Sequence, residues 1–203
     1  MSAPPKTVLV ASPEEASAIR EAVSNVDVTT LGPGSVLATR AHVPGVLELL
    51  ADPAVSEPIY SLPRPFTPAS IAAWIAEAED QRRRGEALLI LTWAADVVIG
   101  YSRITVWPDR ASAEIGGALR ADRQSAGAGS TGAMHTIDWT FQALGVRLIC
   151  LTAALDNIRS TKLVDRMGFV RMGERDAIRP DGTIRRSHYW EMTRDAWHAR
   201  RAP

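Results

Sequence analysis

Cysteine is almost absent from this sequence, and the single one, Cys150, has no intrachain partner for a disulfide. Long apolar runs are also missing: no uninterrupted run approaches the roughly 18 residues that a membrane-spanning helix needs. Residues 1–6 lack the basic start and the apolar core of a signal sequence. We therefore expect a cytoplasmic protein with no membrane partner.

The histidines also lack the spacing of a metal site, and neither basic nor acidic residues are in excess. We expect no metal, because the histidines are neither closely paired nor near a thiol: His42, His135, His188 and His198. Basic and acidic residues balance at 23 each, and the sequence pI is about 6.9. Nucleic acids are polyanions that attract basic proteins, so we expect no nucleic acid as a partner. The 203 residues suffice for one domain of ordinary size.

The first 34 residues have the pattern of a small separate unit. Ser12 can cap a helix that has Pro13 at its first position, and the run Gly-Pro-Gly at 32–34 then interrupts regular structure. We therefore separate an N-terminal accessory extension, 1–34, from a main body, 35–203. The apolar residues of the extension are too few for a core, so we expect it to dock on the body or on a second subunit of a homodimer: Val8, Val10, Ile19, Val23 and Val26.

The main body alternates predicted strands and helices. Apolar runs indicate strands at 36–39, 87–93, 97–106, 113–119, 146–153, 169–172 and 187–192. Helical spacing indicates helices at 43–50, 70–84 and 157–167, and a further one that carries Met134, Ile137, Phe141 and Leu144 before Gly145. The proline-rich stretch 53–68 is expected to be a loop. This order of elements predicts an α/β (α+β) fold.

A glycine-rich stretch directly precedes the helix that ends at Gly145. It reads Gln124-Ser-Ala-Gly127-Ala-Gly129 and continues with Ser130 and Thr131. Glycine lets the backbone approach a ligand closely, and the first amides of a helix have no partner inside the helix. Such an end binds a pyrophosphate, so we expect the run from Gly127 through Ala128 and Gly129 to Thr131 to hold a diphosphate. The alternative is a flexible glycine-rich turn.

The same glycines also spell the dinucleotide pattern G-x-G-x-x-G, from Gly127 to Gly132. In that motif the first glycine follows a strand immediately. Here residues 121–126 intervene after the predicted strand. A single strand–helix–strand unit follows, which is too little for a dinucleotide domain. The pattern therefore favours a diphosphate site of another kind.

The motifs together resemble the GNAT superfamily of N-acyltransferases. The glycine-rich stretch matches its Q/R-x-x-G-x-G/A signature. The upstream pair Ile115-Gly116, the spacing Asn157-x-x-Ser160 and the run 167–169 extend the match. The chain is most similar to the branch of ribosomal-protein N-terminal (Rim-type) acetyltransferases, over 36–197. The resemblance implies a mixed, mostly antiparallel sheet that is splayed at the cofactor site. It also implies acetyl transfer from acetyl-coenzyme A (acetyl-CoA) to a small-molecule amine or a peptide N-terminus.

The resemblance assigns cofactor-binding roles to named residues. Gln124 and the run from Gly127 to Thr131 would hold coenzyme A, and Asn157 would hold its pantetheine arm through the side-chain amide. Backbone N–H groups around Leu119 would bind the thioester oxygen where the strand splays. The pair Gly116-Gly117 is compatible with a β-bulge that causes this splay. Helix capping is the alternative role for Asn157.

Catalytic roles follow in the same way. Many family members place a tyrosine four residues before Gly-Phe, but this sequence has Val164 there, so Ser160 is the candidate general acid. Glu114 is the candidate base, because a carboxylate on the strand before the cofactor turn could accept the amine proton through water. The alternatives are a helix-start serine bonded to the backbone and an exposed strand glutamate. Cys150 lies in an apolar run and is interpreted as a core residue.

The acceptor is expected to enter over two loops, 52–68 and 175–186. Tyr60 and Glu57 in the first loop could contact an ammonium group, although an exposed tyrosine and glutamate in a loop are usually only solvated. A second function class is a non-catalytic acyl-CoA-binding module that keeps the cofactor site without turnover. This alternative stays open because the family tyrosine is absent and the base is not assigned. The sequence does not identify the amine.

Overall fold

The computed structural model describes residues 4–124, 128–178 and 182–200, and the backbone alone of 128–130. Within them, one sheet of seven strands has the order β1-β2-β3-β4-β5-β7-β6, and every neighbouring pair is antiparallel except β4 and β5. The strands are β1 Ser35–Leu37, β2 Ala87–Ala94, β3 Val97–Trp107, β4 Ser112–Leu119, β5 Leu148–Ala154, β6 Val170–Ile178 and β7 Ile184–Thr193. The mixed, mostly antiparallel sheet confirms the predicted fold class.

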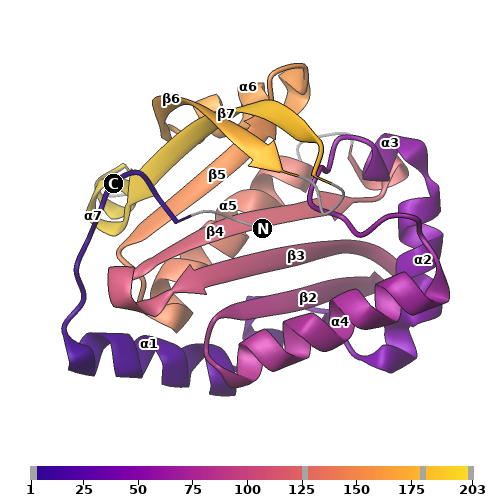
Figure 1. Ribbon diagram of the computed structural model, residues 1–203, viewed down its shortest axis with the longest axis horizontal. Coiled ribbons are helices and arrows are strands. Elements are labelled where there is room, and N and C mark those ends of the chain that lie inside the picture. The colour runs from indigo at the N-terminus through magenta and orange to yellow at the C-terminus, as the bar shows by residue number, and fades with distance from the viewer. Residues whose placement is uncertain (1–3, 125–127, 179–181, 201–203) are drawn as a thin grey trace.

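Helices pack on both faces of this sheet (Figure 1). The α-helices are α1 Pro13–Asn25, α2 Val43–Ala51, α3 Pro53–Ser56, α4 Pro68–Arg83, α5 Ala128–Leu144, α6 Ile158–Arg166 and α7 Arg194–Ala199. Short 3-10 helices are η1 Val28–Leu31, η2 Arg40–His42, η3 Pro108–Arg110 and η4 Ala121–Arg123. In the described part of the chain, no helix is long and apolar enough to cross a membrane.

Local sequence explains where several of these elements begin and turn. Ala95 and Asp96 have φ of 48° and 63°, and they form the tight turn of the predicted β2–β3 hairpin. Thr67 caps α4, because its hydroxyl accepts a hydrogen bond of 3.1 Å from the backbone N–H of Ser70. Pro68 follows at the first helical position, where its missing N–H costs nothing.

Two apolar cores lie on opposite faces of the sheet. The back core joins sheet residues such as Ile149 and Trp190 to side chains of the helices α1, α5, α6 and α7. The front core joins Leu89 and Leu91 of β2 to side chains of α2 and α4. Figure 1 shows α4 lying in front of β2. The helices of the front core cover residues of β1, β2 and β3, such as Val36, Leu91 and Val98.

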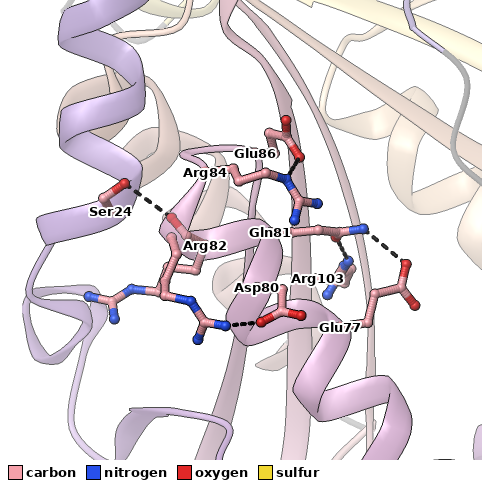
Figure 2. A network of polar contacts seen from close by, with 9 residues as sticks. Ser24, Glu77, Asp80, Gln81, Arg82, Arg84, Glu86 and Arg103 are labelled. Atoms are coloured by element: carbon pink, nitrogen blue, oxygen red, sulfur yellow. Dashed lines mark hydrogen bonds and ion pairs between the residues drawn. The ribbon is translucent and has the colours of Figure 1, made fainter.

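The N-terminal extension packs on the body through α1 and η1. Ile19, Val23, Val28 and Leu31 are buried in the back core. Ser24 adds a hydrogen bond of 3.1 Å from its hydroxyl to a backbone carbonyl of α4, which Figure 2 shows beside the polar network of that helix. These contacts join the extension to the sheet and to α4.

Two expectations about local structure were wrong. Val8 and Val10 do not contribute to an apolar face, because they are 64 % and 80 % exposed and lie in a chain segment outside any strand. The stretch 53–68 is not all loop, because Asp52 caps the short helix α3 by accepting from the N–H of Ala54 at 2.9 Å. A proline at the first helical position favours this helix and does not break it.

Candidate functional site

The parallel pair β4 and β5 forms a fork in the middle of the sheet. Within the described residues the two strands pair at three positions, and the last of these is Glu114 with Cys150. Beyond it, β4 continues beside β3 to Leu119, and β5 continues beside β7 to Ala154. The expected splay is therefore present, and it opens immediately after Glu114.

The splay does not arise from a bulge at Gly116-Gly117. The register between β3 and β4 is continuous from Ser112 to Leu119, so the expected bulge was wrong. The glycines have another role, because a Cβ on Gly117 would lie 2.4 Å from the carbonyl oxygen of Tyr101. Gly117 thus permits a close approach of β3 and β4, and the divergence takes place on the other side of β4.

The end of β4 directs backbone groups into the fork. The N–H of Arg120 donates to the carbonyl of Ile99 at 2.7 Å, toward β3. Successive N–H groups of a strand point to opposite sides, so the N–H of Leu119 points toward the gap between β4 and β5. An oxygen atom in the gap could accept a hydrogen bond there.

Gln124 joins the end of β4 to the start of α6. Its side-chain amide donates to the carbonyl of Leu119, while Arg159 donates to both the side-chain oxygen and the backbone carbonyl of Gln124. Arg159 was missed by the sequence reasoning. A guanidinium in the first turn of the helix that follows the fork was a usable signal, since such a group suits an anionic ligand.

The glycine-rich stretch leads into α5. Gly127 lies outside the described residues, whereas Ala128, Gly129, Ser130 and Thr131 form the first turn of that helix. A first helical turn presents backbone N–H groups and the positive end of the helix dipole. The backbone at 128–131 therefore has the arrangement that a diphosphate requires.

Asn157 and Ser160 lie at the start of α6. The Asn157 side-chain oxygen accepts from the backbone N–H of Ser160 at 3.1 Å, so Asn157 caps the helix. This bond uses the oxygen of the amide, and the amide nitrogen remains the group that can donate to a ligand. Val164, which stands where the family tyrosine is common, is buried in the back core. The half-buried Ser160 hydroxyl lies one turn before it.

Glu114 is the carboxylate at the start of the fork. It is half-buried and accepts a hydrogen bond of 3.1 Å from the hydroxyl of Thr152 on β5. Cys150 beside it is fully buried, and burial, together with the charge of Glu114, raises the pKa of its thiol. A thiol in this state is a poor nucleophile, which agrees with its interpretation as a core residue.

A second carboxylate, Glu191, lies on the other side of Cys150. Cys150 pairs with Glu114 on β4 and with Glu191 on β7, so the three side chains share one face of the sheet. The Tyr189 hydroxyl donates to Glu191 at 2.5 Å. Burial raises the pKa of Glu191, but hydrogen bonds from Thr7 and Tyr189 outweigh it and the net shift is downward. The sequence reasoning missed this cluster, although polar residues two apart on a strand indicated one shared face.

The two expected acceptor loops meet beyond the fork. The Tyr60 hydroxyl donates to the Thr183 hydroxyl at 3.2 Å, and the guanidinium of Arg185 lies 5.5 Å from the centre of the Tyr60 ring. Glu57 is exposed. The described residues contain no group of three or more histidine, cysteine, aspartate or glutamate side chains that could hold a metal.

Comparison with known proteins decides the family. A model described as "Acetyltransferase (GNAT) domain" matches residues 36–170. The chain belongs to the GNAT acetyltransferase family. No match was found among the curated proteins. The enzyme is therefore an acyltransferase whose cofactor is acetyl-CoA, and the fork, the first turn of α5 and Asn157 fit that cofactor.

Solved structures share the fold of this GNAT chain at low sequence identity. Ribosomal-protein-S5-alanine acetyltransferase from Vibrio fischeri is 18% identical with a TM-score of 0.67, over 80% of this chain and 93% of that chain. Mycobacterium smegmatis RimJ, in complex with CoA-disulfide, is 18% identical with a TM-score of 0.67, over 81% and 85%. An acetyltransferase from Salmonella typhimurium that modifies the N-terminal serine of ribosomal protein L7/L12 is 17% identical with a TM-score of 0.68, over 80% and 96%.

Proposed function

We propose that this protein transfers the acetyl group of acetyl-CoA to a primary amine by direct attack, and that the acceptor is a peptide N-terminus or a small-molecule amine. The observation that carries the proposal is the separation of β4 and β5 directly after Glu114. A thioester in the gap would lie at the backbone N–H of Leu119, on the strand that also carries Glu114. The ribosomal-protein acetyltransferases among the similar folds support a peptide acceptor.

The cofactor would be held at both ends of the gap. Backbone N–H groups at 127–131 would bind the diphosphate, with Gln124 and Arg159 beside them. The Asn157 amide nitrogen would donate to the pantetheine arm while its oxygen continues to cap α6. When bound, acetyl-CoA supplies an activated acyl group as a thioester.

The chemical step would use three groups of the chain. Glu114, held by Thr152, would accept the proton that the ammonium loses, through water. The Leu119 N–H would stabilise the negative charge on the carbonyl oxygen as the amine nitrogen bonds to the acyl carbon. As the carbon–sulfur bond breaks, the Ser160 hydroxyl would donate a proton to the departing sulfur, and the second proton that the amine nitrogen loses would restore the serine hydroxyl through solvent. The products are an N-acetylated amine and the free thiol of coenzyme A.

We further propose that residues 1–34 are an accessory extension of an acetyltransferase domain at 35–203. The family match begins at residue 36, and α1 packs on the back core and outside the fork. The extension would then act through stability and through the acceptor side, with the cofactor site left intact.

A panel of amines tests the proposed function. Purified protein is incubated with acetyl-CoA and either a peptide with a free N-terminal serine, the same peptide with a blocked N-terminus, or small primary amines. Release of the coenzyme A thiol should depend on a free amine, and the amide product should gain one acetyl group by mass. Equal thiol release with the blocked and the free peptide would contradict a peptide N-terminus as the acceptor.

A further inference from the structure

Residues 4–7 form a strap, defined here as Pro4 to Thr7, that lies on the front face of β6 and β7. Each of its four residues offers a main-chain group to a side chain of the body. The N–H of Lys6 donates to the Tyr189 hydroxyl at 3.0 Å, and the N–H of Thr7 donates to Glu191 at 3.0 Å. Two carbonyls accept in turn: that of Pro4 from Arg175 at 2.8 Å, and that of Pro5 from Arg110 at 3.1 Å.

These contacts recognise polypeptide backbone and are nearly independent of sequence. Any extended peptide carries N–H and C=O groups at the same spacing, and side chains that bind them form a groove for a main chain. Tyr189 and Glu191 are buried, and so is Pro5 of the strap. The hydrogen bonds between the strap and these side chains are therefore partly shielded from water, and hydrogen bonds shielded in this way are stronger.

The groove lies on the same face of the sheet as Glu114. Tyr189 on β7 pairs with Thr152 on β5, and the Thr152 hydroxyl donates a hydrogen bond to Glu114. Glu191 pairs with Cys150, and Cys150 pairs in turn with Glu114 on β4. Neighbouring strands lie about 4.8 Å apart, and β7, which carries Tyr189 and Glu191, is two strands from β4, which carries Glu114. In Figure 1 the indigo N-terminal segment runs from α1 along the edge of the molecule and past α7.

One contact of the strap depends on a side chain. The ammonium of Lys6 donates to the backbone carbonyls of Met172 and Glu174, at 2.9 Å and 3.1 Å. These carbonyls flank Gly173, where φ is 92° and the register of β6 with β7 shifts. The same ammonium lies 5.3 Å from the centre of the Tyr189 ring. Lys6 therefore latches the strap to an irregularity of β6.

We propose that this groove binds the main chain of a polypeptide acceptor, and that the strap occupies it in competition with that acceptor. The proposal rests on the function proposed above. A peptide whose amine lies at Glu114 would run along the front face toward β7, where the strap lies. A tethered occupant lowers the apparent affinity of a competing peptide by the fraction of time that it fills the groove. A small amine, which reaches the fork alone, is not affected.

Lys6→Glu in the full-length protein tests the proposal, with Lys6→Arg as the matched control. A carboxylate in place of the ammonium is repelled by the two β6 carbonyls, whereas a guanidinium can still donate to them. Lys6 is exposed and contacts neither the fork nor α5, so the fold and the cofactor site should persist. Hydrogen exchange of the Lys6 and Thr7 amides reports whether the strap has been released.

Two further measurements separate the strap from the chemistry. The first titrates each protein with a labelled synthetic peptide of the sequence of residues 4–10, without acetyl-CoA. The peptide should bind Lys6→Glu at least about tenfold more tightly than it binds wild type or Lys6→Arg. The second compares kcat/KM for a peptide amine and for a small primary amine, and only the peptide value should rise, by a similar factor.

The outcomes are distinct. If no acceptor is acetylated, the proposed function fails, yet tighter peptide binding by Lys6→Glu still supports the groove. A strap that stays protected from exchange in Lys6→Glu overturns the latch on which the proposal depends. A released strap with unchanged peptide binding overturns the groove. Lower activity toward peptides after release shows that the strap builds the acceptor site and does not compete for it.

Discussion

Glu114 on β4 is paired with Cys150 on β5 at the last position before the two strands separate. This pairing fixes a carboxylate at the point where the central fork opens, and Thr152 on β5 holds it there by a hydrogen bond of 3.1 Å. The acidic side chain therefore lies at the start of the fork, whereas the N–H of Leu119 lies farther along the same strand.

Replacement of Glu114 by glutamine should lower kcat by about a hundredfold or more, because the amide keeps the size of the side chain and cannot accept the amine proton. The affinity for acetyl-CoA should change little, since no cofactor-binding role is assigned to this side chain. Stopped-time assays of thiol release and calorimetric titration measure the two quantities. A mutant with wild-type kcat across the pH range would remove Glu114 as the base.

Two substitutions of Asn157 should separate its capping role from its ligand role. Asn157→Ala removes the cap and should lower the free energy of unfolding by about 1 kcal/mol. Asn157→Asp retains a side-chain oxygen for the Ser160 N–H and should preserve stability, but it lacks the amide N–H groups. Weaker acetyl-CoA binding in the stable Asn157→Asp protein supports contact with pantetheine. Unchanged binding would leave Asn157 as a cap alone.

Alanine substitutions at the two adjacent glycines of β4 should have different effects on the free energy of unfolding. In Gly117→Ala the new Cβ would lie 2.4 Å from the Tyr101 carbonyl oxygen, whereas at Gly116 nothing lies within 4 Å of it. Because backbone must move, Gly117→Ala should lower the free energy of unfolding by about 1–3 kcal/mol. Gly116→Ala is the control and should be neutral or slightly stabilising. Equal urea midpoints for the two mutants would contradict the close approach of β3 and β4.

Such a close approach could not be predicted from the sequence. The pair Gly116-Gly117 signalled a special backbone site, but a bulge and a tight contact between regular strands need the same residue type. The hairpin turn at Ala95 and Asp96 was predictable, because its cause is local. The cap at Asn157 was also foreseen, as one of two roles for that residue.

The cluster around Glu191 was missed for a related physical reason. Within this cluster Thr7 and Glu191 are 184 residues apart in the sequence, and their hydrogen bond forms only when the chain has folded. For the same reason Val8 and Val10 were expected in an apolar face, although the strap next to them binds through its main chain and leaves their side chains exposed. Periodicity indicates which residues are apolar but not whether the neighbouring backbone is the group that binds.

Acid should weaken the contribution of Glu191 to stability. Its pKa is lowered in the folded state from the usual 4.5, so the stabilisation is fully present above that value and is lost as the pH falls through the lower folded pKa. Glu191→Gln cannot ionise. The difference in the free energy of unfolding between wild type and this mutant should therefore shrink below about pH 4.5.

The comparison with Glu191→Gln isolates this carboxylate from the groups that face it. Burial raises the pKa of both Tyr189 and Cys150, so they stay protonated throughout. Lys6 and Arg175 are the nearby cations, and Glu114 lies beyond Cys150. Urea unfolding at pH 7, 4 and 3 gives the comparison. A difference that is the same at all three pH values would show that the Glu191 pKa is not lowered by folding.

Amine-dependent release of coenzyme A tests the central claim most directly. Wild-type protein and Glu114→Gln are incubated with acetyl-CoA and a primary amine, and the free thiol and the acetylated product are measured together. The account predicts one acetylated amine for each thiol released, at a rate that the substitution lowers about a hundredfold. A protein that binds acetyl-CoA but releases thiol no faster with any peptide or small amine than without one would contradict it, and would leave a binding module without transferase activity.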